Sequence, residues 1–164
     1  YGRKVCAWAA AAGRRDVVEW ALANGFPGCD VVCYRAAGGG QLALLVWARE
    51  NNFPWTAATC VTAAAHGHLP VLQWARQNGC AWNSLVCSKS ARGGHLDVLK
   101  WARAHGCKWT VGTCSLAACC GNLELLIWAR ANGCPWDRST CTAATHGRNP
   151  AVLQWIHENG CPCD

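Results

Sequence analysis

The chain has 164 residues, of which 52% are hydrophobic and only 15% are charged, and its net charge is +6. Its uninterrupted apolar runs, such as residues 6–12, are far shorter than the roughly 20 residues that span a bilayer, which excludes a transmembrane protein. The basic residues are mostly scattered, so the charge suits an acidic partner but falls short of a nucleic-acid patch. Because no basic segment followed by an apolar stretch opens the sequence, we expect an intracellular, cytoplasmic protein.

Tryptophan, cysteine and glycine each recur every 27 residues. The tryptophans of this series are Trp20, Trp47, Trp74, Trp101, Trp128 and Trp155, and the cysteines are Cys6, Cys33, Cys60, Cys87, Cys114 and Cys141. A fixed period of this length is the signature of a stacked repeat protein, which presents long surfaces rather than pockets. The sequence therefore predicts a single domain, 1–164, of six repeats: 1–27, 28–54, 55–81, 82–108, 109–135 and 136–162.

The first element of each repeat is predicted to be a short helix. In the repeat 55–81, Thr56 is a suitable N-cap because its hydroxyl can accept from an unpaired amide of the first helical turn. A run rich in small residues follows over about 57–65, so that neighbouring helices can approach closely. Gly67 then supplies the positive φ with which helices commonly end.

A second helix is predicted to complete each repeat. It covers about residues 70–77, with Pro70 in the first turn, where the missing N–H costs nothing, and Asn78-Gly79 at its end. The links between repeats are short and contain prolines such as Pro54, which would block the hydrogen bonds of a strand. The predicted fold class is therefore all-α, a solenoid of helix-turn-helix repeats.

Aromatic and cationic columns accompany these helices. Trp74 lies within a helix and Trp82 lies in a link, and both positions repeat along the chain. They would serve either as stacking platforms for single-stranded nucleic acid or sugars, or as buried wedges between hairpins, which the strict periodicity favours. One arginine column, formed by Arg49, Arg76, Arg103 and Arg130, would either bind phosphate or offset the helix dipole at each helix end, and we favour the second role.

Fourteen cysteines would suggest disulfides in a small secreted domain, but their placement argues otherwise. Four of them, including Cys80, occupy a column in which Phe26 and Phe53 fill the earlier repeats, and a position that accepts Phe or Cys is an apolar packing position. We therefore expect reduced, buried thiols. Cys119-Cys120, Cys161-x-Cys163 and six histidines supply metal ligands in number, but the repeat explains the cysteine spacing without a metal, so we expect neither a metal nor another cofactor.

The segments AAAHGHLPVLQWARQNGC at 63–80 and ARGGHLDVLKWARAHGC at 91–107 resemble the core of an ankyrin repeat. The first shares its Ala-Ala pair, Gly-His turn, Val-Leu helix opening and Asn-Gly helix end, and the second shares the Gly-His turn and the Val-Leu opening. The repeat is about six residues shorter than the ankyrin length of 33, and the deficit falls around Trp82, where the family carries a β-hairpin finger. The chain is similar in this respect to the short, Trp- and Cys-rich ankyrin-like arrays of giant DNA viruses and protists.

This resemblance implies a non-catalytic scaffold that binds a partner protein along the concave face of its first helices. The columns that vary freely on that face give the candidate binding residues Trp8, Arg35, Thr62, Lys89, Arg92, Leu116 and His146. They combine basic side chains with possible apolar anchors. The alternatives are a binder of nucleic acid or another polyanion through this face and, more remotely, a metal-binding cysteine-rich protein. No acid–base pair, nucleophile motif or phosphate-binding loop stands out, so we expect no enzyme activity and no small-molecule substrate.

The end repeats depart from the pattern. In the sixth repeat Gly147-Arg148-Asn149 replaces the usual turn, and Ile156-His157 replaces Ala-Arg. The chain also begins and stops within a repeat, so we expect a piece of a longer array. The viral arrays that it resembles sometimes accompany an F-box, a ubiquitin-ligase adaptor, and no F-box is visible in this sequence.

Overall fold

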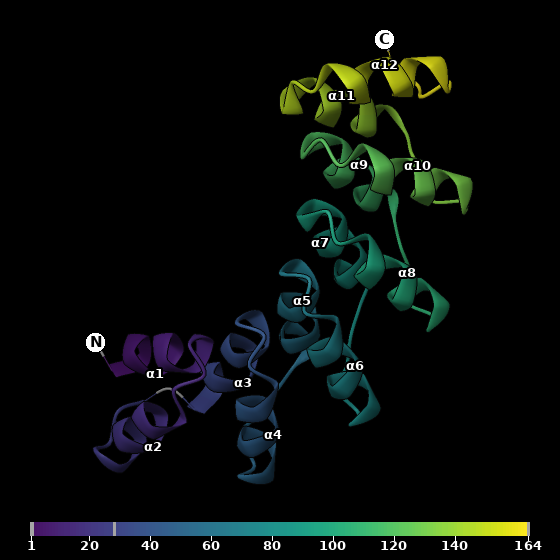
Figure 1. The fold of residues 1–164 in the computed structure, drawn as a ribbon. Helices are drawn as coiled ribbons and strands as arrows, with labels where there is room; N and C mark the ends of the chain where they lie inside the picture. Colours follow the sequence, from purple (N-terminus) through teal and green to yellow (C-terminus); the bar gives the residue numbers. More distant parts are fainter. Residues whose placement is uncertain (1, 28, 164) are drawn as a thin grey trace. The chain divides into compact units, whose positions relative to one another are not determined.

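The computed structural model describes residues 2–27 and 29–163, while Tyr1, Gly28 and Asp164 lie outside the described residues. Within these ranges the chain forms twelve α-helices and no strand, which confirms the all-α prediction (Figure 1). The first helices of the hairpins are α1 (Gly2–Ala11), α3 (Cys29–Gly38), α5 (Ala57–Ala65), α7 (Leu85–Gly93), α9 (Val111–Cys119) and α11 (Arg138–Gly147). The second helices are α2 (Arg15–Ala23), α4 (Leu42–Glu50), α6 (Leu69–Gln77), α8 (Leu96–Ala104), α10 (Leu123–Ala131) and α12 (Pro150–Glu158).

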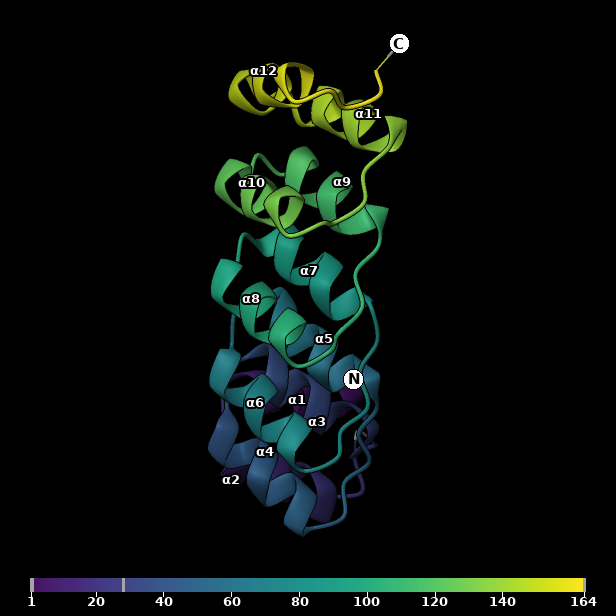
Figure 2. The same cartoon turned by 90° about the vertical axis from the view of Figure 1, so that its right-hand side faces the viewer.

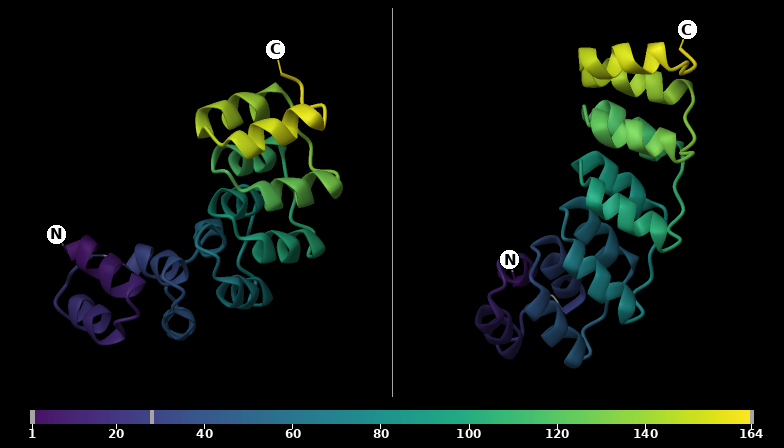
Figure 3. Two further views of the ribbon diagram at one scale, coloured as in Figure 1. Left: turned by 45° about the horizontal axis from the view of Figure 1, so that its top comes forward. Right: turned by 45° about the vertical axis from the view of Figure 1, so that its right-hand side comes forward.

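The chain divides into two compact units, Tyr1–Trp82 with α1–α6 and Asn83–Asp164 with α7–α12. In the first unit α1, α3 and α5 pack side by side, and α2, α4 and α6 fold back against them (Figures 1 and 3). In the second unit α7, α9 and α11 form one layer and α8, α10 and α12 the other (Figure 2). The boundary between the units falls one residue beyond the predicted repeat 55–81.

The first helices begin at capping side chains in some repeats only. The Thr56 hydroxyl accepts the Ala58 N–H at 3.3 Å, as predicted, and the Asp137 carboxylate accepts the Ser139 N–H at 2.8 Å. Thr110 has the same extended backbone, but its side chain accepts no capping hydrogen bond within the described residues. Capping at this position is therefore a local contribution that the fold does not require in every repeat.

Residues with positive φ end both helices of a hairpin. Gly67 (φ +76°) adopts the left-handed conformation, as the sequence predicts, and so does Gly79 (φ +84°). Asn52 (φ 61°) and Arg148 (φ 52°) adopt the same conformation where a repeat has no glycine at the equivalent position. The turn geometry is thus maintained even where the residue type is unfavourable.

Small residues on the first helices and leucines on the second helices form the core. Ala63 and Ala64 are fully buried on α5, and Gly39 lies so close to α1 that an added Cβ would come within 2.0 Å of the Ala11 carbonyl oxygen. The second helices contribute a column of fully buried side chains formed by Leu45, Leu72, Leu99 and Leu126. Small residues on one layer and large residues on the other allow short helices to stack closely.

Side chains in the hairpin turns hydrogen-bond to the preceding repeat. The His68 Nε2–H donates to the Gly38 carbonyl at 3.1 Å, and the Asn122 Nδ2–H donates to the Ala91 carbonyl at 2.7 Å. Gln41, just before α4, makes the equivalent contact, because its Nε2–H donates to the Ala11 carbonyl at 3.3 Å. These bonds satisfy carbonyl groups that the first helix leaves unpaired at its C-terminus.

Among the described residues, no helix is both long and apolar enough to cross a bilayer.

Candidate functional site

An arginine near the end of a second helix fastens the link to the following repeat. The Arg103 guanidinium lies 4.0 Å from the ring centroid of Trp109, and its Nη1–H donates to the Cys107 carbonyl at 2.6 Å. The same stacking joins Arg49 to Trp55 at 4.4 Å, Arg76 to Trp82 at 4.4 Å and Arg130 to Trp136 at 4.1 Å. The arginine column is therefore structural, and its contacts to the link add to the effect on the helix dipole that the sequence predicts.

The helix tryptophans are less buried than the sequence predicts. Trp74 and Trp128 are half-buried and meet the link residues Trp55 and Trp109 edge-on, with ring centroids 5.9 Å and 6.0 Å apart. Trp20 is 56% exposed. The prediction of buried wedges is thus wrong for Trp20 and too strong for the other two. The indoles cover the outer edge of each hairpin, where they hold helix and link together, because the leucines already fill the interior.

In the first unit, the candidate residues lie beside a basic groove between α1 and α3. Trp8 is 75% exposed on α1, and Arg35 is exposed on α3, where its guanidinium lies 5.2 Å from the centroid of the Tyr34 ring. The groove is lined by Arg3, Lys4, Ala7, Val31, Tyr34 and Arg35. Arg3 forms an ion pair with Asp30, so its charge is partly compensated. Cationic rims over an apolar floor suit an acidic peptide segment that also carries apolar side chains.

Thr62 has a different environment from the other candidate residues. It is half-buried on α5, and its hydroxyl lies within hydrogen-bond distance of the Ala58 carbonyl at 2.8 Å and of the Tyr34 carbonyl at 3.0 Å. The second of these contacts crosses from α5 to α3. The hydroxyl is therefore engaged in holding the two first helices together, and the residue offers a partner little beyond its methyl group.

In the second unit, Lys89 and Arg92 lie one turn apart on α7, the first half-buried and the second exposed. Leu116 is half-buried on the neighbouring α9, and His146 is exposed at the end of α11. His146 also lines a shallow groove on α11 together with Arg138, Cys141, Thr142, Thr145 and Cys163. The predicted residues of this unit therefore spread over three first helices, and most carry positive or titratable groups.

Most of the described cysteines are buried thiols, as predicted. Burial raises the pKa of Cys33 to about 11. Thiols of the two cysteine columns form pairs, such as Cys87 with Cys107 and Cys60 with Cys80. The neighbouring Cys107 thiol and burial raise the pKa of Cys87. The hydrogen bond from Cys60 lowers the pKa of Cys80. A raised pKa and low exposure make thiols such as Cys33 and Cys87 poor nucleophiles. Cys120 is exposed, Cys119 is half-buried, and the side chain of Cys29 lies outside the described residues.

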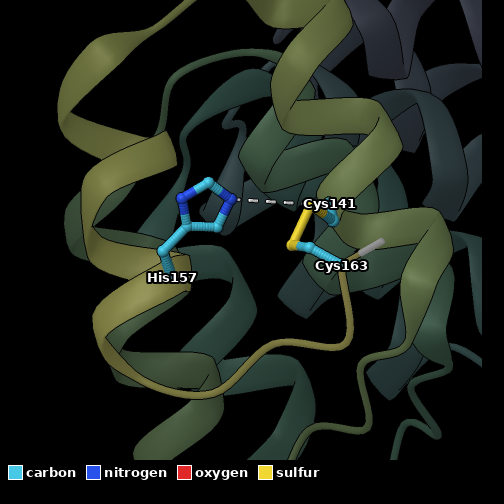
Figure 4. A group of neighbouring side chains, drawn as sticks. All are labelled: Cys141, His157 and Cys163. Carbon is cyan, nitrogen blue, oxygen red and sulfur yellow. Dashed lines mark hydrogen bonds between the residues drawn. A yellow bond between two sulfur atoms is a disulfide. The ribbon is translucent and has the colours of Figure 1, made fainter.

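Cys141 and Cys163 contradict the prediction of reduced thiols, because they form a disulfide with a Cα–Cα distance of 5.6 Å (Figure 4). His157 points at this disulfide from α12, with its Nε2 3.9 Å from the Cys141 Sγ. The sulfur and nitrogen atoms of the three residues all lie within 4.8 Å of one another. We name this group the C-terminal cysteine cluster. The sequence pattern offered Cys163 paired with Cys161 and offered His157 only as one of six histidines, and it did not predict that both would lie beside Cys141.

A signal for this cluster was present in the repeat columns. His157 stands 27 residues after Arg130, and Cys163 stands 27 residues after Trp136, so the pair that fastens the link in earlier repeats is replaced as a whole. A small Cys in place of the link Trp leaves room for its sulfur to reach Cys141 on α11.

The comparisons with known proteins bear on the fold. No protein-family model and no curated protein matches the sequence. Among solved structures, the crystal structure of the human ASB11 ankyrin repeat domain is similar with a TM-score of 0.70 and 15% identity, and the match covers 94% of this chain and 83% of that one. The helical hairpins found here therefore have the ankyrin-repeat fold that the sequence resemblance implies. Domains of this fold are commonly protein-interaction scaffolds and typically non-enzymatic.

Proposed function

We propose that this ankyrin-repeat chain is a non-catalytic scaffold that binds a partner protein through the exposed faces of its first helices. The observation that carries the proposal is Trp8, whose indole on α1 is 75% exposed, more than any other large hydrophobic side chain among the described residues. Exposed tryptophans beside polar rims are typical anchors of protein interfaces. Lys4 and Arg35 line the groove between α1 and α3, and Lys4 lies one helical turn before Trp8 on α1.

Charge supports an acidic segment as the bound element. The chain carries 15 Lys and Arg against 9 Asp and Glu. Among the described residues, the ion pairs of Arg3, Arg14 and Arg15 with acidic side chains compensate three of these cations. Lys4, Arg35, Lys89 and Arg92 are not in those pairs, and all four lie on first helices. In each unit their field would speed association with a negatively charged partner at the first helices.

The test is site-specific photocrosslinking in cell extract. A photoreactive phenylalanine analogue replaces Trp8 in one protein and Trp20 in another, because Trp20 is also exposed but lies on the second-helix layer. We expect a discrete protein to crosslink at position 8 and not at position 20. With that protein purified, Trp8→Ala should weaken binding by about 10-fold or more, as loss of an anchor residue does, while Trp20→Ala should leave it unchanged.

Two outcomes would contradict the proposal. Crosslinking at position 20 alone would place the partner on the other layer. The second contradicting outcome is that the species crosslinked at position 8 is a nucleic acid and not a protein. Binding to a mixed-sequence single-stranded RNA that falls steeply and log-linearly with salt would then support the polyanion alternative, because phosphate contacts release counterions.

A further inference from the structure

The C-terminal cysteine cluster occupies a position that the other repeats use for a different purpose. Arg130 stacks on Trp136 at 4.1 Å, and the corresponding residues one period later are His157, in the last repeat, and Cys163, just after it. Cys141 belongs to a cysteine column that continues through the repeats, so it is present in any case. The arginine and the tryptophan of this stacked pair have thus both been replaced by residues that ligate metals, and both replacements face Cys141 (Figure 4).

The arrangement contains more than a disulfide requires. A disulfide needs only Cys141 and Cys163, yet the His157 ring lies with its Nε2 3.9 Å from the Cys141 sulfur. In four of the other repeats an arginine at this position donates to a carbonyl of the link, as Arg130 does to Cys134. His157 instead aims its ring nitrogen at sulfur. Two thiolates and an imidazole nitrogen form a ligand set that suits Zn²⁺, with Zn–S bonds of about 2.3 Å and Zn–N bonds of about 2.0–2.1 Å.

We propose that the cluster binds one Zn²⁺ ion through Cys141, His157 and Cys163 when its disulfide is reduced. A dithiol reductant transfers two electrons and two protons to the disulfide, which yields two thiols while the reductant becomes a disulfide. Zn²⁺ then replaces both thiol protons, which leave to solvent, and the imidazole nitrogen completes three protein ligands. The fourth tetrahedral position is open to water.

The surroundings of the cluster allow a metal ion to enter. His157 is exposed and Cys163 is half-buried, so the ligands are not sealed in the core. The groove on α11 that contains Cys141 and Cys163 opens to solvent beside Arg138 and Thr142. The ligands also come from three separate segments, α11, α12 and the residues after α12, so that a bound ion would tie the end of the chain to the last hairpin.

The experiment uses the full chain, reduced with excess dithiothreitol, stripped with a chelator and desalted without oxygen. Co²⁺ is the probe, because thiolate-to-cobalt charge transfer in the near ultraviolet and tetrahedral d–d bands in the visible report its ligands. We expect one equivalent of Co²⁺ to bind with these spectra and to be displaced by one equivalent of Zn²⁺. The oxidised protein should bind neither ion at this site.

The matched control rebuilds the Arg–Trp pair that occurs four times earlier in the chain. The double variant His157→Arg with Cys163→Trp should remain folded and lose affinity for Co²⁺ by about 100-fold or more. Cys163→Ser serves as a second variant with a smaller change of volume, and Cys120→Ser, at an exposed cysteine outside the cluster, should bind as wild type does. Circular dichroism establishes that each variant is folded.

Two results would overturn the proposal. One is a folded, reduced wild-type protein that binds no stoichiometric Co²⁺. The other is equal binding by wild type and by the folded Arg–Trp variant, which would assign the metal to other thiols. Alkylation of the reduced protein followed by mass spectrometry adds an independent readout: Zn²⁺ should slow modification of Cys141 and Cys163 and leave that of Cys120 unchanged.

Discussion

Thr59 is a buried polar residue at a position that three of the other repeats fill with valine and two with threonine. It has no exposed surface, and its hydroxyl finds no hydrogen-bond partner among the described residues. Val32 occupies the equivalent position of the preceding repeat and is also fully buried. Because an unpaired buried hydroxyl is costly, we expect Thr59→Val to leave the free energy of unfolding unchanged or raise it by about 1 kcal/mol in urea denaturation.

The reciprocal variant Val32→Thr is the control. It buries a hydroxyl in the same environment and should lower the free energy of unfolding by about 1–3 kcal/mol. If Thr59→Val were as destabilising as Val32→Thr, the Thr59 hydroxyl would have to be hydrogen-bonded in solution.

Arg148 carries a backbone strain that glycines avoid in the other turns. Its φ is 52°, whereas the equivalent Gly67 and Gly121 have φ values of 76° and 75°. A side chain in the left-handed region costs energy that glycine does not pay, so Arg148→Gly should raise the free energy of unfolding by about 0.5–1 kcal/mol. Thermal denaturation monitored by circular dichroism measures this change in stability. As a control, Ala151→Gly within α12 should lower the stability by about 1 kcal/mol, which separates the turn effect from any general effect of glycine.

At the scale of the helix and its link, the arginine and tryptophan columns together hold each second helix to the link that follows it. Arg103 stacks on Trp109 and donates to the Cys107 carbonyl, so Arg103→Ala should lower the free energy of unfolding by about 2 kcal/mol. Arg103→Lys keeps the charge but loses the planar stack, and it should recover only part of the loss.

A control separates this contact from the helix dipole. Arg92 also lies in the last turn of its helix but is exposed, and Arg92→Ala should cost no more than about 0.3–1 kcal/mol. Equal losses at Arg92 and Arg103, or full recovery by Arg103→Lys, would show that charge at the helix end accounts for the whole effect.

The periodicity predicts the hairpins well because each repeat repeats the same local signals. The α5 helix spans Ala57–Ala65 as expected, and α6 begins at Leu69, one residue before the predicted start. How far the tryptophan side chains are buried could not be predicted in the same way. A period places Trp20 and Trp74 on equivalent helix faces, but it carries no information on how far the leucine layer already fills the interior.

The binding surface and the cysteine cluster differ in what the sequence can show. Trp8 and Arg35 prove exposed, yet their role as partner contacts stays a prediction, because exposure alone does not identify a ligand. The cluster was missed because the contacts among Cys141, His157 and Cys163 arise between segments 16 and 22 residues apart. Only the replacement of an Arg–Trp pair by a His–Cys pair hints at them.

At the scale of the whole molecule, buried thiols occur in both units. Burial is the main cause that raises the pKa of Cys33 in the first unit, and in the second unit the neighbouring Cys134 thiol, with burial, raises the pKa of Cys114. A thiol that keeps its proton in the folded state but releases it when unfolded makes stability depend on pH. A thiol with a raised pKa therefore contributes stability at neutral pH that is lost under alkaline conditions.

Cys33 allows this dependence to be tested because Phe53, and not a second thiol, occupies its link position. Its pKa rises from 9.0 to about 11, so its contribution to stability is complete below pH 9 and is lost as pH rises towards 11. Between these values the unfolded chain has released the proton and the folded chain has not. The free energy of unfolding should therefore fall by up to about 1.4 kcal/mol per pH unit from this thiol.

Urea denaturation at a series of pH values measures the slope. Cys33→Ala should flatten the alkaline decline by up to about that amount, because the titrating group is gone, whatever constant loss the smaller side chain causes. Val32→Ala truncates the neighbouring buried residue and should lower stability by a constant at every pH, with the wild-type slope retained. If both variants kept the wild-type slope, Cys33 would have to ionise equally in the folded and unfolded chains, which is incompatible with a thiol sealed between helices.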